Sequence, residues 1–294
     1  MNIALKSHSS LLDYIKVLKP RETSLLLFIG ASSAVIAAST IGGVFPVSDF
    51  IMALVAITLG SAGANGLTNY LDRDVDARMK RTCGRVLPSK KIQPAEKALA
   101  LALALIVIGL VIAWILSPVC FFIGLIGVVA SAVWRKTISC TFFGIIAGSA
   151  PILIGWYAIT KQPVIGIMPV LLFCLIALWT PAHVWTLMIA NRADYENAGL
   201  HYFPLSFKDN VVIWMLAVLS IALSVVAFLV YSLTGKFHLL YLVVSSILSL
   251  VMIYANIRLL FSPTSRNAWT VYKISAFPYL GIIFAVMAVD SWLM

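Results

Sequence analysis

Charged residues are scarce in this sequence. Of its 294 residues, 11% are Asp, Glu, Lys or Arg, whereas 62% are hydrophobic. A soluble domain carries roughly 25% charged residues, so the composition excludes an ordinary water-soluble domain. Cysteine is also scarce, and Cys83, Cys120, Cys140 and Cys174 have no paired spacing. We therefore expect neither a disulfide framework nor a zinc site.

Linkers rich in Gly, Pro or Ser are absent as well, so we expect one domain over residues 1–294. Long uncharged runs fill this domain, and about 20 apolar residues suffice for a helix to cross a bilayer. The runs predict an all-α membrane bundle of nine transmembrane helices. The predicted helices cover residues 22–41, 50–71, 96–116, 118–134, 140–160, 164–190, 211–233, 238–260 and 270–292.

The basic residues predict the orientation of the bundle. If the N-terminus lies inside, only Lys161 and Lys236 of the 21 Lys and Arg fall outside. Basic residues gather on the cytoplasmic side, so we expect a cytoplasmic N-terminus in the cell membrane. The net charge of +10 then reflects topology, and no nucleic-acid partner is expected. Residues 1–20 carry leucines and an isoleucine at helical spacing, which favours an arm on the membrane surface; a simple linker is the alternative.

A polar face is predicted where the second apolar run ends. At about 100° per residue on a helix, four side chains share an arc of about 60°, namely Asn65, Asn69, Asp72 and Asp76. Asp74 points to the opposite side. Carboxylates one turn apart repel unless a positive charge lies between them. Mg²⁺ suits this need because it takes oxygen ligands and shares them with phosphates and water.

Cations follow the polar face in the same segment: Arg78, Lys80, Arg81, Arg85, Lys90 and Lys91. One interpretation is a solvated helix end whose acids pair internally with neighbouring cations. The other is a site for a metal-bound polyanion, in which carboxylates hold the metal and cations neutralise phosphate charge. The next inner turn adds Arg135 and Lys136, which topology alone would explain and which could also contact phosphate.

The sixth predicted span carries His183 and leads to a second acidic segment. If its helix continues, His183, Asn191 and Asp194 lie within about 80° of one another, with His183 about 16 Å deeper. An ionisable side chain inside a bilayer is a functional candidate by default, so we expect a substrate or proton role for His183. A packed, hydrogen-bonded histidine is the alternative. Glu196 lies two residues beyond Asp194, so one of the two acids is expected to face away.

These residues resemble a known family. Residues 69–76 (NYLDRDVD), followed by 79–82 (MKRT) and 85–88 (RVLP), are similar to the first signature of the UbiA-type intramembrane prenyltransferases, in the form closest to the protohaem IX farnesyltransferases, or haem O synthases. Further segments agree with this family over nearly the whole chain: 135–137, 148–155, 179–183, 194–204 and 265–290.

The resemblance implies a transfer of farnesyl from farnesyl diphosphate to a vinyl group of haem B, with Mg²⁺ as cofactor and Asp72, Asp76 and His183 as catalytic residues. It assigns the metal to Asn69, Asp72, Asp76 and Asp194, with Glu196 as a further candidate acid. It assigns the diphosphate to Asn69, Arg81, Arg85, Arg135, Lys136 and Asp194. His183 would orient haem or handle a proton. Membrane lipid is an expected partner, and so are transient haem-handling or terminal oxidase proteins.

Two alternatives stay open. A related prenyltransferase could use another acceptor, such as a quinone precursor or a prenyl glycerol phosphate. An ion-coupled transporter or lipid carrier, a protein of another class, would instead show Mg²⁺-independent uptake.

Overall fold

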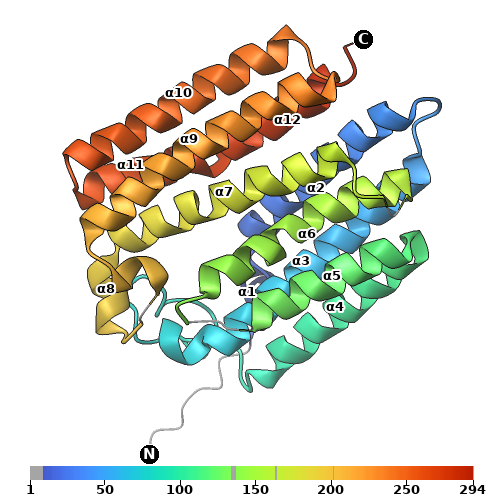
Figure 1. Ribbon diagram of the computed structural model, residues 1–294. Helices are drawn as coiled ribbons and strands as arrows, with labels where there is room; N and C mark the ends of the chain where they lie inside the picture. Colours follow the sequence, from blue (N-terminus) through green and yellow to red (C-terminus); the bar gives the residue numbers. More distant parts are fainter. Residues whose placement is uncertain (1–8, 134–136, 163, 201, 294) are drawn as a thin grey trace, which may run out of the picture.

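The computed structural model describes residues 9–133, 137–162, 164–200 and 202–293. Long helices run side by side in one bundle (Figure 1). The C-terminus and the α2–α3 connection lie at one end, whereas α8 and the segment between α3 and α4 lie at the other (Figure 1). The first half of the chain contains α1 (Leu11–Val17), α2 (Pro20–Ile41), α3 (Val47–Asp76), α4 (Glu96–Leu116), α5 (Pro118–Ala132) and α6 (Cys140–Thr160).

In the second half, the described secondary-structure elements are also all helices. It contains α7 (Ile167–Ala190), α8 (Arg192–Asn197), the short 3₁₀ helix η1 (Phe203–Ser206), α9 (Asp209–Thr234) and α10 (Leu239–Phe261). A last helical stretch combines α11 (Ser265–Ile274), the π-helical turn η2 (Ser275–Gly281) and α12 (Ile282–Asp290).

The predicted membrane bundle is confirmed in its class. Among the described residues, eight helical segments are long and apolar enough to cross a membrane: α2, α3, α4, α6, α7, α9, α10 and the continuous stretch Ser265–Asp290. The remaining predicted span, residues 118–134, corresponds to α5, an apolar helix of 15 residues. Its start is fixed by Ser117, whose hydroxyl accepts from the Cys120 N–H, and by Pro118 in the first turn. The chain is therefore a multi-pass membrane protein with one short apolar helix beside its spanning helices.

Small residues bring these helices close together. A Cβ added to Gly155 would lie 2.1 Å from the Gly30 carbonyl oxygen, so only glycine permits this α2–α6 contact. Gly63 and Gly109 play the same part between α3 and α4, where an added Cβ would meet backbone atoms at 2.7 and 2.8 Å. Lipid offers little hydrophobic drive for helix association, so close packing supplies much of the stabilisation. This packing fixes the position of α3, which carries the polar face.

Charges at the end of the bundle away from α8 pair locally. Lys161 Nζ lies 2.8 Å from Asp49 Oδ2. Asp290 is fully buried and accepts from the backbone N–H of His238. Asp49 and Asp290 thus both have partners within a few residues of the helix ends. The other end of the bundle holds the acids and cations of the predicted site.

Candidate functional site

The polar face of α3 forms as predicted. One helix continues from Val47 through Asp76, so the side chains keep their helical register beyond the apolar run. Asn69, Asp72 and Asp76 are buried, with 7–8% of their surface exposed, whereas the Asp74 side chain is 82% exposed. Two carboxylates and one amide are thus enclosed together on α3, and the third carboxylate faces away.

Asn69 is the innermost of these three. Its Nδ2 donates to the Val17 carbonyl at 2.6 Å, which ties α3 to the N-terminal arm. Its Oδ1 is buried and has no hydrogen-bond partner among the described residues. A buried carbonyl oxygen without a donor is costly, so this atom is available to a cation or to a donor on a ligand.

The donor set fits Mg²⁺. The amide oxygen of Asn69 and the carboxylates of Asp72 and Asp76 are hard oxygen ligands, which Mg²⁺ prefers. Among the described residues, no three His, Cys, Asp or Glu side chains gather as a complete metal cage. Mg²⁺ commonly binds through one or two carboxylates and completes its shell with phosphate and water, so these residues match a metal that arrives with a phosphorylated substrate.

The segment after α3 folds back over the polar face. Its Val86, Leu87 and Ile92 are buried in a small hydrophobic cluster with Val17 of the arm. The Thr82 hydroxyl donates to the Asp76 carbonyl at 3.0 Å. Arg85 Nη1 lies 2.7 Å from Asp76 Oδ2. This apolar anchoring brings a cation of the segment directly onto one of the two enclosed carboxylates.

Asp194 reaches the same segment from the other half of the chain. One carboxylate oxygen accepts from the Lys80 N–H at 2.8 Å, and the other accepts from the Arg81 N–H at 3.2 Å. The structure corrects the prediction of a continuous helix from His183 to Asp194, because the helix breaks at Asn191 (φ −122°, ψ 25°). The break starts the separate helix α8, whose new direction carries Asp194 to the α3–α4 segment. The shared arc predicted for His183, Asn191 and Asp194 is therefore wrong.

Arg81 is held at both of its ends by α8. Asp194 accepts its backbone N–H, and the Tyr195 hydroxyl accepts from its Nη2 at 3.3 Å. Burial raises the pKa of the Tyr195 phenol, so this hydroxyl stays neutral at physiological pH. The Arg81 guanidinium is therefore held by a neutral hydroxyl and not by a carboxylate, so its positive charge remains available to a bound anion.

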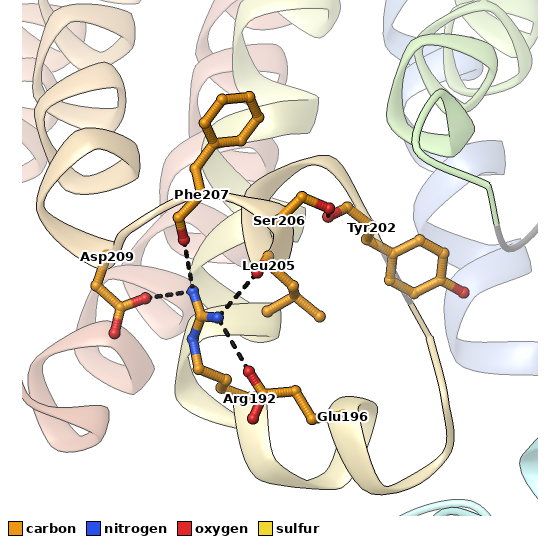
Figure 2. Close-up of polar contacts among 7 residues, drawn as sticks. All are labelled: Arg192, Glu196, Tyr202, Leu205, Ser206, Phe207 and Asp209. Atoms are coloured by element: carbon orange, nitrogen blue, oxygen red, sulfur yellow. Dashed lines mark hydrogen bonds and ion pairs between the residues drawn. The ribbon is translucent and has the colours of Figure 1, made fainter.

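Arg192 fixes α8 itself (Figure 2). Its guanidinium donates to the carbonyls of Leu205 and Phe207 at 3.0 and 3.3 Å, and pairs with the carboxylates of Glu196 and Asp209 (Figure 2). The planar guanidinium has five N–H donors and suits such a junction. Glu196 is therefore engaged in this junction, whereas Asp194 faces the α3–α4 segment. Of the two acids considered from sequence, Asp194 is the one that binds the cationic segment after α3.

His183 lies in α7 within a stack of rings. Its ring centroid is 4.7 Å from that of Trp179 and 4.4 Å from that of Tyr272. Its Nδ1 is 2.8 Å from the hydroxyl of Ser275, the residue at which η2 begins. Sequence analysis identified His183 and Trp179 but gave no role to Tyr272 or Ser275, which are about 90 residues further along the chain.

Two of the cavities along α3 reach residues of its predicted polar face. The first, of about 150 Å³, is lined mainly by small apolar residues such as Gly60, Ala64 and Gly127, and reaches Asn65 and Thr68. The second, of about 460 Å³, lies at the arm; its basic lining residues are Lys16, Lys19, Arg21, Arg85 and Lys91, and Asn69 also lines it. Sequence analysis gave Lys19 and Arg21 no part in the site; the available signal was that both fall on the predicted inner side with most of the other basic residues.

Arg135 and Lys136, the remaining predicted diphosphate contacts, lie outside the described residues. The structure therefore brings together Asn69, Asp72, Asp76, Arg81, Arg85 and Asp194 at one end of the bundle. His183 belongs to the ring stack in α7.

The chain matches the UbiA prenyltransferase family over residues 26–279. A relative from Desulforudis audaxviator, named protoheme IX farnesyltransferase, is 35% identical over 289 residues, which cover 95% of this chain and 88% of the relative. A relative of the same name from Thermus thermophilus is 32% identical over 95% of this chain. The chain spans 46% of the length of that longer relative.

Solved structures show the same fold. A structure described as digeranylgeranylglyceryl phosphate synthase aligns with a TM-score of 0.78 at 16% identity, over 97% of this chain and 99% of that one. A UbiA homologue from Archaeoglobus fulgidus, bound to GPP and Mg²⁺, aligns with a TM-score of 0.64 at 15% identity, over 94% and 99% of the two chains.

Proposed function

Because the chain belongs to the UbiA prenyltransferase family, we propose that it transfers a farnesyl group from farnesyl diphosphate to a vinyl group of protohaem IX, giving haem O. The choice of haem as acceptor is supported by relatives named protoheme IX farnesyltransferase, one of them 35% identical. The structural observation that carries the chemistry is the enclosed face of Asn69, Asp72 and Asp76 under a cationic segment held by Asp194.

The proposed diphosphate site lies between this face and that segment. Asn69 Oδ1 and the carboxylates of Asp72 and Asp76 would hold Mg²⁺ together with the diphosphate oxygens. When bound, the metal withdraws charge from the diphosphate and makes it a better leaving group. A complex of a homologue with GPP and Mg²⁺ supports the metal requirement of this fold.

Cations of the segment complete the neutralisation of the leaving group. Arg85 and Arg81 are positioned by Asp76 and Tyr195 respectively, so their charges need little reorganisation when negative charge develops. Arg135 and Lys136 are proposed as additional contacts. Asp194 acts at the diphosphate by holding the backbone of the segment, and the second lone pairs of its oxygens leave it able to ligate metal as well.

The farnesyl chain would enter the apolar cavity beside α3. This cavity begins next to Asn65 and Thr68, within two turns of Asp72, and its small lining residues leave space for a hydrocarbon chain. Loss of diphosphate leaves an allylic cation, which survives only where water is kept away. An apolar cavity that begins within two turns of the metal face would meet both needs.

We place the N-terminus and the site on the cytoplasmic side of the cell membrane. The reason is that all Lys and Arg except Lys161 and Lys236 fall in the segments that the predicted topology puts on the same side as the N-terminus. Membrane lipid surrounds the bundle in this proposal. Transient contact with haem-handling or terminal oxidase proteins stays a prediction.

The deciding experiment is turnover of the purified protein with farnesyl diphosphate and haem, with and without Mg²⁺, followed by mass analysis of the extracted haem. A Mg²⁺-dependent gain of a hydroxyethylfarnesyl group is expected. Mg²⁺-dependent loss of diphosphate without a haem product would contradict the acceptor and direct the search to quinone precursors or prenyl glycerol phosphates. Absence of diphosphate binding would contradict the site itself.

A further inference from the structure

The ring of His183 is covered on both faces. The Trp179 ring lies at 13° to it and the Tyr272 ring at 23°, with centroids at 4.7 and 4.4 Å. An imidazole face has room for one stacked ring, so the two aromatics occupy opposite faces. This sandwich prevents the imidazole from tilting and leaves only its edges available for polar contacts.

Ser275 defines which ring nitrogen carries the proton. Its hydroxyl donates to the Tyr272 carbonyl at 2.9 Å, which uses its single hydrogen. Towards His183 Nδ1, at 2.8 Å, the same oxygen can therefore only accept. The network assigns the hydrogen to Nδ1 and leaves a lone pair on Nε2. Ser275 is itself fully buried, and its carbonyl accepts from Trp179 Nε1. Ser275 therefore holds both the Trp179 ring and the His183 ring in place.

His183 keeps part of its surface exposed, while its two faces are stacked and its Nδ1 is bonded to Ser275. The Nε2 edge is the part of the ring that these contacts leave uncovered. A fixed imidazole thus presents the Nε2 lone pair at its uncovered edge.

We propose that His183 Nε2 takes the proton from the water that completes the haem side chain, and that Ser275 is the residue that positions it. This inference rests on the proposed function. The C1–O bond of farnesyl diphosphate breaks and the diphosphate leaves with the electron pair. The terminal vinyl carbon of haem bonds to C1, which leaves a cation on the inner vinyl carbon. Water oxygen bonds to that carbon and its proton passes to Nε2.

The surroundings of the ring suit this proton transfer. The imidazolium that forms still donates through Nδ1 to Ser275, and it lies between two aromatic faces that attract a cation. Nothing is oxidised or reduced, and the proton is later released to solvent. Without the base, the same cation loses a carbon-bound proton instead and gives a farnesylated alkene that is lighter by one water.

The test is the ratio of hydroxylated to alkene product from the full-length protein with haem and farnesyl diphosphate. For His183→Gln we expect about 100-fold less hydroxylated product, the usual range for losing a general base, with the alkene fraction rising. Ser275→Ala should shift the ratio in the same direction, whereas Ser275→Thr, which keeps a hydroxyl, should retain the wild-type ratio. Ser220→Ala is the matched control, because it removes a buried hydroxyl that bonds only within α9.

A second measurement tests the tautomer alone. In ¹⁵N-histidine spectra, the signals that disappear in His183→Gln should show a protonated Nδ1 and an unprotonated Nε2. Ser275→Ala should move them towards a mixture of tautomers, whereas Ser220→Ala should not.

The outcomes separate this inference from the proposed function. If the wild type makes no farnesylated haem, the proposed function fails. If the wild type makes hydroxylated haem and both variants keep its ratio, only the inference is overturned. If His183→Gln makes no product at all, Ser275→Ala decides: an unchanged ratio or an unchanged tautomer contradicts the assignment.

Discussion

Arg85 and Asp76 form an ion pair across the end of α3, with 2.7 Å between Nη1 and Oδ2. The Asp76 side chain is 9% exposed, whereas that of Arg85 is 36% exposed. One end of the pair is therefore enclosed with Asn69 and Asp72, and the other end remains open to an incoming anion. The pair links the proposed metal face to the proposed diphosphate cations.

This link predicts that Arg85→Gln will weaken substrate use. The variant removes the guanidinium from both Asp76 and the diphosphate, so we expect KM for farnesyl diphosphate to rise and kcat to fall, with kcat/KM lower by about 100-fold, as for loss of a charged transition-state contact. Arg85→Lys should recover only part of the loss, because lysine keeps the positive charge but lacks the planar guanidinium that can donate two parallel hydrogen bonds. Steady-state kinetics measure this, with exposed Arg78→Gln as the control in the same segment. Equal losses at Arg78 and Arg85 would contradict a specific contact.

The helical register predicts an unequal effect of the three aspartates. Asp72→Asn and Asp76→Asn should each lower turnover by about 100-fold or more, because each removes an enclosed charge from the proposed metal face. Asp74→Asn should change it by less than about threefold, since exposed polar substitutions are usually mild. Turnover and thermal unfolding are measured together, so that a folding defect is recognised. Similar losses at all three positions would mean that the polar face is not the site.

Removal of the metal tests the same face by another route. Chelation of divalent cations should abolish diphosphate release, and added Mg²⁺ should restore it. Asn69→Ala should raise the Mg²⁺ concentration needed for half-maximal rate about tenfold or more, the usual scale for lost metal-site contacts, because it removes the unpartnered Oδ1. Ser32→Ala is the control, since it removes a buried hydroxyl that donates to the Phe28 carbonyl within α2. Full activity in the presence of chelator would contradict a metal role.

Local periodicity predicted the parts of the site that lie on one helix. Asn69, Asp72 and Asp76 could be placed together because α3 keeps its 3.6-residue repeat past the apolar run. The position of Asp194 could not be derived this way, because the break at Asn191 has no proline or glycine to announce it. The break depends on tertiary contacts. The Arg192 guanidinium binds the carbonyls of Leu205 and Phe207 and the carboxylate of Asp209, and these contacts hold α8 away from the axis of α7.

Contacts between distant parts of the chain were beyond sequence reasoning for the same reason. The pairing of His183 with Ser275 joins α7 to a π-helical turn near the C-terminus, and no repeat links the two segments. The cationic cavity at the arm likewise depends on how Val17 packs against Val86 and Leu87. The sequence indicated which residue types matter, whereas their partners follow from packing.

Asp194 and Glu196 offer the sharpest contrast in the second half of the chain. Asp194 accepts two backbone N–H groups of the α3–α4 segment, whereas Glu196 lies 3.1 Å from Arg192 and is half exposed. Asn has a single carbonyl oxygen in place of the two carboxylate oxygens, so Asp194→Asn should release Lys80 or Arg81 and raise KM for farnesyl diphosphate about tenfold, while the Mg²⁺ requirement stays unchanged.

Glu196→Gln should leave KM unchanged and lower the free energy of unfolding by no more than about 1 kcal/mol, as for an exposed ion pair. Kinetics over a range of both farnesyl diphosphate and Mg²⁺ separate these effects. If Asp194→Asn instead raises the half-saturating Mg²⁺ concentration as Asn69→Ala does, Asp194 ligates the metal directly, and its bonds to the segment are secondary. If Glu196→Gln has the larger effect on KM, the assignment of the two acids is reversed.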